Sequence, residues 1–157
     1  MGTGMKDARI RKGRLSDRRA ILRLLASQRM ATDIDPTDFI VAEAKGRLLG
    51  AARLTWVGKG AAFLRPIVVA EEARRTGLGR ALLESLSGMC VSITVIARSD
   101  AVPFYQHLGF AAVEWSSVPG IYREECESCD EMEQCRPTPM RRTIREGRLP
   151  GEGETGR

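Results

Sequence analysis

The sequence contains no long apolar run. No stretch of its 157 residues approaches the roughly 18 consecutive apolar residues that a membrane-spanning helix requires. The polar start at residues 1–6 is not followed by the apolar segment of a secretion signal. These absences argue against a helical membrane protein, and we expect a cytoplasmic protein with no membrane partner.

Aromatic residues are also scarce, at two Trp, two Tyr and four Phe. The chain carries 25 basic and 20 acidic residues, a formal net charge of +5, with basic clusters near residues 9–23, 74–80 and 141–148. Such clusters suit an anionic partner, which is either a phosphate-bearing cofactor or nucleic acid. Because few rings are available for base stacking, we expect no nucleic-acid partner.

The four cysteines are unevenly placed. Cys126, Cys129 and Cys135 lie close together in the sequence, whereas Cys90 stands apart, just before an apolar run. In a chain without a secretion signal, this distribution argues against a disulfide scaffold.

The length favours one mixed α/β domain over residues 1–145, with no internal repeat and a disordered tail at 146–157. A helix that Ser16 caps is expected to bury its apolar face, and further helices are expected at 77–89 and 100–108, the last one ending at Gly109. Residues 116–137 are expected to form a cysteine-containing loop. Strands are expected at residues 8–11, 38–44, 48–57, 61–69, 91–97, 110–115 and 138–144.

The segment that indicates chemistry joins the apolar strand 61–69 to the helix at 77–89. A glycine-rich turn at a helix start presents unpaired N–H groups and the positive end of the helix dipole, which together bind phosphate. Nearby arginines add charge-assisted hydrogen bonds. The competing interpretation is a turn shaped by glycine with solvated arginines. The predicted phosphate-binding residues are Arg74, Arg75, Thr76, Gly77, Leu78, Gly79 and Arg80.

These residues resemble the coenzyme A-binding motif of the GNAT acyltransferases. The likeness runs from Ile67-Val68-Val69 through Arg74-x-x-Gly77-x-Gly79, and residues 101–110, with Tyr105-x-x-x-Gly109-Phe110, are similar to a second family segment. The resemblance covers roughly residues 8–145. It implies a central mixed sheet of about seven strands, flanked by helices and splayed between the fourth and fifth strands, with acetyl-CoA as cosubstrate.

The resemblance also implies roles for individual residues. The pantetheine arm of acetyl-CoA is expected to pair with backbone groups at Ile67, Val68 and Val69, where an amide polarises the thioester carbonyl. Tyr105 is expected to protonate the departing thiolate, unless it is only a core aromatic. The fourth strand offers no carboxylate to deprotonate the amine, which leaves Glu43 or a water chain.

Arg65 is the candidate for acceptor recognition. On a half-buried strand it shares a face with Ile67 and Val69, where its guanidinium fork suits a carboxylate; a surface or salt-bridged arginine is the other interpretation. Cys126-x-x-Cys129 and Cys135 are three candidate ligands for zinc or an iron–sulfur cluster. A closed structural site needs four ligands, and Asp130 or Glu131 is a candidate for the fourth. Unligated thiols and a reversible disulfide stay open.

The cysteine spacing, together with Arg65 before Pro66, is similar to that of short N-acetylglutamate synthases within the GNAT group. This chain departs from them after Cys135, where Arg136-Pro137 replaces an acidic pair. We therefore expect an N-acetyltransferase of amino-acid metabolism acting on a small amine or amino acid, with glutamate as one candidate. A protein N-terminus or lysine is the rival acceptor, a non-catalytic acyl-CoA-binding module is the rival class, and a homodimer is compatible with the sequence.

Overall fold

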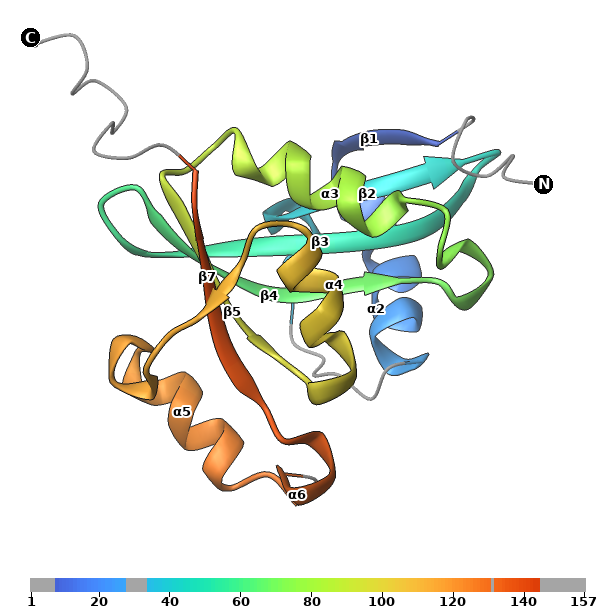
Figure 1. The fold of residues 1–157 in the computed structure, drawn as a ribbon. Helices are drawn as coiled ribbons and strands as arrows, with labels where there is room; N and C mark the ends of the chain where they lie inside the picture. Colours follow the sequence, from blue (N-terminus) through green and yellow to red (C-terminus); the bar gives the residue numbers. More distant parts are fainter. Residues whose placement is uncertain (1–7, 28–33, 131, 145–157) are drawn as a thin grey trace, which may run out of the picture. The chain divides into compact units, whose positions relative to one another are not determined.

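The computed structural model describes residues 8–27, 34–130 and 132–144. Figure 1 shows the helices and strands of the chain, and the contacts within the chain divide it into two compact units. Unit 1 comprises Met1–Thr55 and Leu64–Met89, and unit 2 comprises Trp56–Phe63 and Cys90–Arg157. The predicted tail at 146–157 lies outside the described residues.

The strands form one seven-stranded mixed sheet in the order β1-β2-β3-β4-β5-β7-β6. This confirms the expected fold class. The strands are β1 (Arg9–Lys12), β2 (Phe39–Ala44), β3 (Arg47–Gly58), β4 (Ala61–Val69), β5 (Ser92–Ala97), β6 (Ala111–Ala112) and β7 (Thr138–Thr143). The α-helices are α2 (Arg18–Ser27), α3 (Leu78–Ser87), α4 (Val102–His107), α5 (Gly120–Glu127) and α6 (Met132–Cys135).

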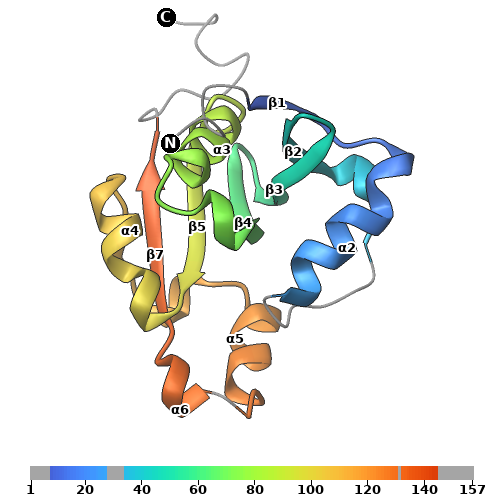
Figure 2. The ribbon, with the colours of Figure 1, turned by 90° about the vertical axis from the view of Figure 1, so that its right-hand side faces the viewer.

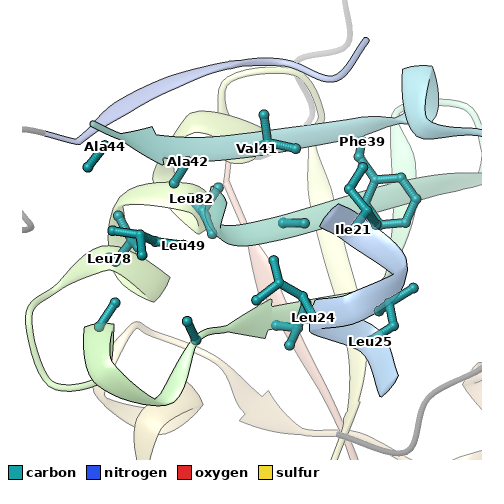
Figure 3. Packing of buried hydrophobic residues seen from close by; sticks show 14 residues of the cluster. Ile21, Leu24, Leu25, Phe39, Val41, Ala42, Ala44, Leu49, Leu78 and Leu82 are labelled. Atoms are coloured by element: carbon teal, nitrogen blue, oxygen red, sulfur yellow. The ribbon is translucent and has the colours of Figure 1, made fainter. Parts of the chain in front are cut away.

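The core of unit 1 consists of apolar side chains from α2, α3, β2, β3 and β4, together with Ala70 and Ala73 just after β4 (Figure 3). Ile21, Leu24 and Leu25 of α2 repeat at helical spacing and are buried, as the sequence predicts. Leu78 and Leu82 of α3 are also buried, with 2% and 0% of their surfaces exposed. The start of α2 differs from the prediction, because the carboxylate of Asp17, not the hydroxyl of Ser16, accepts the Arg14 amide at 2.7 Å.

Close contact between α3 and β3 depends on Gly50. A Cβ at this position would lie 2.9 Å from Leu82 Cδ1 and 3.3 Å from the Val68 carbonyl oxygen. Only glycine therefore lets the helix and the neighbouring strand approach this closely. This packing fixes the end of β4 and the start of α3, the two parts of the predicted cofactor site.

Unit 2 contains the end of the sheet where β7 pairs antiparallel with both β5 and β6. Residues 110–115 were predicted to be a full strand, but only Ala111–Ala112 pair. The amide of Val113 still donates to Pro139 O at 2.9 Å. Pro139 has no N–H to return, so the ladder ends at this point and the chain continues into a short 3-10 helix at Trp115–Ser117.

Residues 116–137 are not a plain loop, since they contain α5 and α6. Both helices lie at the end of unit 2 where β7 begins (Figures 1 and 2). The ring of Tyr122 on α5 stacks on that of Phe63 on β4, with centroids 3.9 Å apart and planes at 8°. Because Phe63 is 1% exposed, this stack attaches α5 to the buried core of unit 2.

Candidate functional site

The turn before α3 has the geometry that the sequence predicts for binding an anion. Gly77, the N-cap of α3, has φ +89°, a left-handed conformation, and no side chain caps the helix. The first amide of α3 to donate to a backbone carbonyl is that of Ala81, to Gly77 O at 3.0 Å. Among the described residues, the amides at 78–80 have no acceptor, and they lie at the positive end of the helix dipole.

Arg75 adds a second left-handed residue to this turn, with φ +66°. This conformation is uncommon for a residue with a Cβ and tends to occur at sites that bind ligands. Thr76 stabilises the turn by donating its hydroxyl to Ala73 O at 2.5 Å. Arg74, Arg75 and Arg80 are exposed, so their guanidinium groups are accessible to an anion beside the amides.

β4 continues past the point where it pairs with β5. The parallel ladder joins residues 61–63 of β4 to 92–94 of β5, and the strand then continues to Val69. Backbone groups of residues 64–69 are thus not used in that ladder. Val68 is buried at 3% exposure, while Ile67 and Val69 are half-buried against the unit 1 core. These are the residues predicted to pair with an extended ligand.

Tyr105 lies on α4 and is 5% exposed. Its ring packs edge-on against Phe104 and Phe110, with centroids 5.1 and 5.2 Å apart. Burial raises the pKa of its phenol above the ordinary value, so the hydroxyl keeps its proton at any physiological pH. The ring is therefore part of the core, and the hydroxyl has the protonation state that a general acid requires. The predicted catalytic role stays a prediction.

Glu43, the candidate base, is held in a charged cluster. Arg11 donates its Nε to Glu43 Oε1 at 2.7 Å and its Nη1 to Asp17 Oδ2 at 2.8 Å. The hydrogen bond from Arg11 lowers the pKa of the Glu43 carboxyl. A carboxylate stabilised in this way is a weaker proton acceptor, so the cluster gives Glu43 a role in joining β1, β2 and the start of α2. Its assignment as the base stays a prediction.

Arg65 is exposed on β4, and its carbonyl oxygen accepts a hydrogen bond from Arg53 Nε at 3.0 Å. The guanidinium of Arg53 also lies 5.3 Å from the centre of the Phe39 ring. Two arginines thus stand next to each other on neighbouring strands. Arg53 was not among the predicted site residues, although counting back from the two-residue turn at 59–60 brings position 53 beside 65 and 66.

The three clustered cysteines lie on or beside α5 and α6. Cys126 and Cys135 are half-buried and Cys129 is exposed. Within the described residues, which do not include Glu131, no group of three or more His, Cys, Asp or Glu side chains is arranged to hold a metal ion. The assignment of the three cysteines as metal ligands stays a prediction. Cys90 is buried, and burial raises the pKa of its thiol.

Comparison with known proteins identifies the domain type. Residues 14–118 match the family model described as the acetyltransferase (GNAT) domain. An uncharacterized N-acetyltransferase of Chlorobaculum tepidum is 25% identical over 153 residues, which cover 88% of this chain and 97% of that protein.

Two solved structures are similar in fold. The N-acetylglutamate synthase of Neisseria gonorrhoeae, in complex with coenzyme A and L-arginine, superposes with a TM-score of 0.72 at 17% identity over 87% of this chain. The match spans only 33% of that longer chain. Ard1 of Thermoplasma volcanium superposes with a TM-score of 0.69 at 18% identity, over 89% of this chain and 99% of that one. In the part of the chain that the structure covers, no helix has the length and apolar character to cross a membrane.

Proposed function

This chain belongs to the GNAT acetyltransferase family, and on that premise we propose that it transfers the acetyl group of acetyl-CoA to the primary amine of a small molecule or amino acid. The observation that carries the proposal is the turn before α3. Its left-handed Gly77 and the acceptor-free amides at 78–80 match the needs of a diphosphate. Arg74, Arg75 and Arg80 supply the positive charge.

The proposed chemistry is direct attack of the amine on the thioester. The nitrogen forms a bond to the acetyl carbon, the carbon–sulfur bond breaks, and the thiolate takes a proton from the Tyr105 hydroxyl. A backbone amide at Val68 or Val69 polarises the thioester carbonyl, which β4 permits because these residues lie beyond its ladder with β5. The amine gives its proton to a base, and the lowered pKa of Glu43 makes water a better candidate than that carboxylate.

The proposed class of acceptor is inferred from two arginines on the neighbouring strands β4 and β3. Arg65, with Arg53 beside it, offers a cationic surface to a carboxylate. This supports an amino acid as acceptor and keeps glutamate among the candidates. A protein N-terminus is the second candidate acceptor, because the ribosomal-protein-S18-alanine N-acetyltransferase of Escherichia coli is another protein of similar fold. We include in the same proposal that the enzyme acts in amino-acid metabolism.

The decisive assay is release of coenzyme A thiol from acetyl-CoA in the presence of an amine panel. The panel contains glutamate, other free amino acids, short peptides with free N-termini, and N-acetyl-lysine amide. We expect a free amino acid to give the highest kcat/KM. Tight coenzyme A binding without thiol release for any amine would contradict an enzyme and support an acyl-CoA-binding module.

The variant Arg75→Gly tests the effect of Arg75 on coenzyme A binding without destabilising the fold. Glycine accepts φ +66° without strain, so the thermal midpoint should stay unchanged or rise. Loss of one charge-assisted contact should weaken coenzyme A binding by roughly tenfold, measured by calorimetry. Arg23→Gln is the control, since Arg23 is exposed on α2 and is not part of the turn before α3. Equal affinity losses in the two variants would contradict the proposed site.

A further inference from the structure

A pocket of about 280 Å³ lies beside α5, and its lining includes none of the residues proposed for cofactor binding. It is called the α5–α6 pocket here, and its lining consists of Trp115, Arg123, Cys126, Glu127 and Met132. Ligand pockets for drug-sized molecules usually measure about 300–1,000 Å³. The volume therefore suits a molecule the size of one amino acid.

Two opposite charges line this pocket without pairing. Arg123 and Glu127 are four residues apart on α5, a spacing at which side chains are neighbours, although arginine before the acid is the weaker order for an ion pair. The Arg123 guanidinium turns back toward Gly120, with Nη2 3.8 Å from where a Cβ would stand. Within the described residues neither side chain forms a salt bridge.

The rest of the lining is apolar and held in place. Trp115 and Met132 are half-buried, and Cys126 lies between the two charges on the helix. Stacking of Tyr122 on the buried Phe63 fixes α5, the helix that carries both charges. Two charges about one helical turn apart, facing an apolar wall, are complementary to a compact zwitterion with an apolar substituent.

The acidic residues around the pocket indicate which side chain the bound amino acid carries. Residues 114–135 contain seven acidic residues and one basic residue, Arg123, in a chain whose net charge is +5. An anionic side chain on the ligand would meet this negative field, whereas a neutral one would not. Glutamate is thus a poor occupant of this pocket, and amino acids with apolar side chains are good ones.

We propose that the α5–α6 pocket binds a free α-amino acid with an apolar side chain, its carboxylate on Arg123, its ammonium on Glu127 and its side chain against Trp115 and Met132. The binding requires neither acetyl-CoA nor acetyl transfer. The proposed acetyltransferase activity and this site therefore succeed or fail independently.

Tryptophan fluorescence tests the proposal directly. The chain has two tryptophans, and Trp56 is 52% exposed, so Trp56→Phe leaves Trp115 as the reporter inside the pocket. Titration of this protein with L-leucine or L-methionine, up to about 10 mM, should change the emission with a dissociation constant of roughly 1 mM. L-Leucine methyl ester and N-acetyl-L-leucine each lack one charge and should bind about tenfold more weakly.

Variants identify the two contacts. Arg123→Gln should remove the preference for L-leucine over its methyl ester, and Glu127→Gln the preference for L-leucine over N-acetyl-L-leucine. Glu124→Gln is the matched control, since Glu124 is exposed on the same helix but does not line the pocket. No emission change with L-leucine, equal binding of its ester, or equal effects of Glu124→Gln and Glu127→Gln would overturn the proposal.

Discussion

Tyr105 combines a buried ring with a hydroxyl that stays protonated, and a single substitution separates the two contributions. Tyr105→Phe keeps the ring contacts with Phe104 and Phe110 and removes only the proton donor. We expect kcat to fall roughly a hundredfold or more, with little change in the affinity for acetyl-CoA. Steady-state kinetics and calorimetry measure the two quantities.

The pH profile provides an independent check on Tyr105. Because burial raises the pKa of the phenol above its ordinary value of about 10, the hydroxyl does not lose its proton as pH rises toward that value. The kcat profile of the unsubstituted protein should therefore show no falling limb from this residue below about pH 10. An unchanged kcat in Tyr105→Phe would remove the assignment.

The cluster of Arg11, Asp17 and Glu43 predicts how stability depends on pH. The hydrogen bond from Arg11 lowers the pKa of Asp17 in the folded state below its unfolded value of about 3.9. A lowered folded pKa stabilises the protein above the unfolded pKa, and this contribution is lost as pH falls through the folded pKa. Asp17→Asn should cost about 2 kcal/mol of unfolding free energy near neutral pH.

Urea unfolding at several pH values tests this prediction. The difference in unfolding free energy between the unsubstituted protein and Asp17→Asn should shrink as pH falls below about 4, where the carboxylate takes up protons. Glu43→Gln tests the role of Glu43 in the same way. If Glu43 serves in the ion pair, the variant is less stable and its kcat is unchanged. If Glu43 is the base, kcat falls and the stability is unchanged. An Asp17→Asn penalty that stays constant down to the lowest pH would contradict the linkage.

At the scale of elements, the contact between α3 and β3 predicts a non-additive pair. Gly50→Ala forces a Cβ to within 2.9 Å of Leu82 Cδ1 and should cost about 1–3 kcal/mol of unfolding free energy. Leu82→Ala alone should cost about 2–5 kcal/mol through the cavity it leaves. The double variant should cost less than the sum, because Leu82→Ala removes the atom that the new Cβ meets.

Gly58→Ala is the control for this cycle. A Cβ at Gly58 would meet only Ala61 Cβ, at an ordinary 3.8 Å, so its cost should simply add to that of Leu82→Ala. Denaturant unfolding of the single and double variants measures all the terms. Full additivity of Gly50→Ala with Leu82→Ala would show that α3 and β3 relax apart instead of clashing.

The elements that the sequence predicts well are those with unambiguous signals. β4 has the predicted bounds at 61–69, and α3 begins at Leu78 directly after Gly77, because a glycine turn and a long apolar period define them. β6 was predicted too long, because the sequence pattern of residues 110–115 does not reveal that the strand lies beside Pro139 of β7. α5 was missed because it buries few apolar residues and its packing depends on Tyr122 reaching Phe63.

The same distinction applies to the site. The anion-binding turn is local in sequence, so Arg75, Gly77 and the α3 amides were predictable from spacing alone. The partners of Glu43 were not, because they depend on the register of β1 with β2, in which Arg11 lies opposite Val41. Distant partners of this kind become visible only when the strands are aligned.

At the scale of the whole molecule, charge is distributed unevenly along the chain. Residues 114–135 carry seven acidic residues and one basic residue, while the net charge of the chain is +5, so the remainder is strongly basic. Interactions between exposed charges weaken with salt, because the screening length falls from about 10 Å at 0.1 M to about 3 Å at 1 M. A multiply charged ligand on exposed arginines should therefore be sensitive to salt.

Ionic strength should thus separate the two proposed ligands. Raising the salt concentration from about 0.05 M to about 0.3 M should weaken coenzyme A binding roughly threefold to tenfold, because the exposed Arg74, Arg75 and Arg80 act on a polyanion. L-Leucine is neutral overall, so its affinity for the α5–α6 pocket should change less than about twofold over the same range. Calorimetry for coenzyme A and Trp115 fluorescence for L-leucine give the two slopes. A coenzyme A affinity as insensitive to salt as that of L-leucine would mean that the arginines around α3 do not contact the phosphates, and that uncharged surfaces hold the cofactor instead.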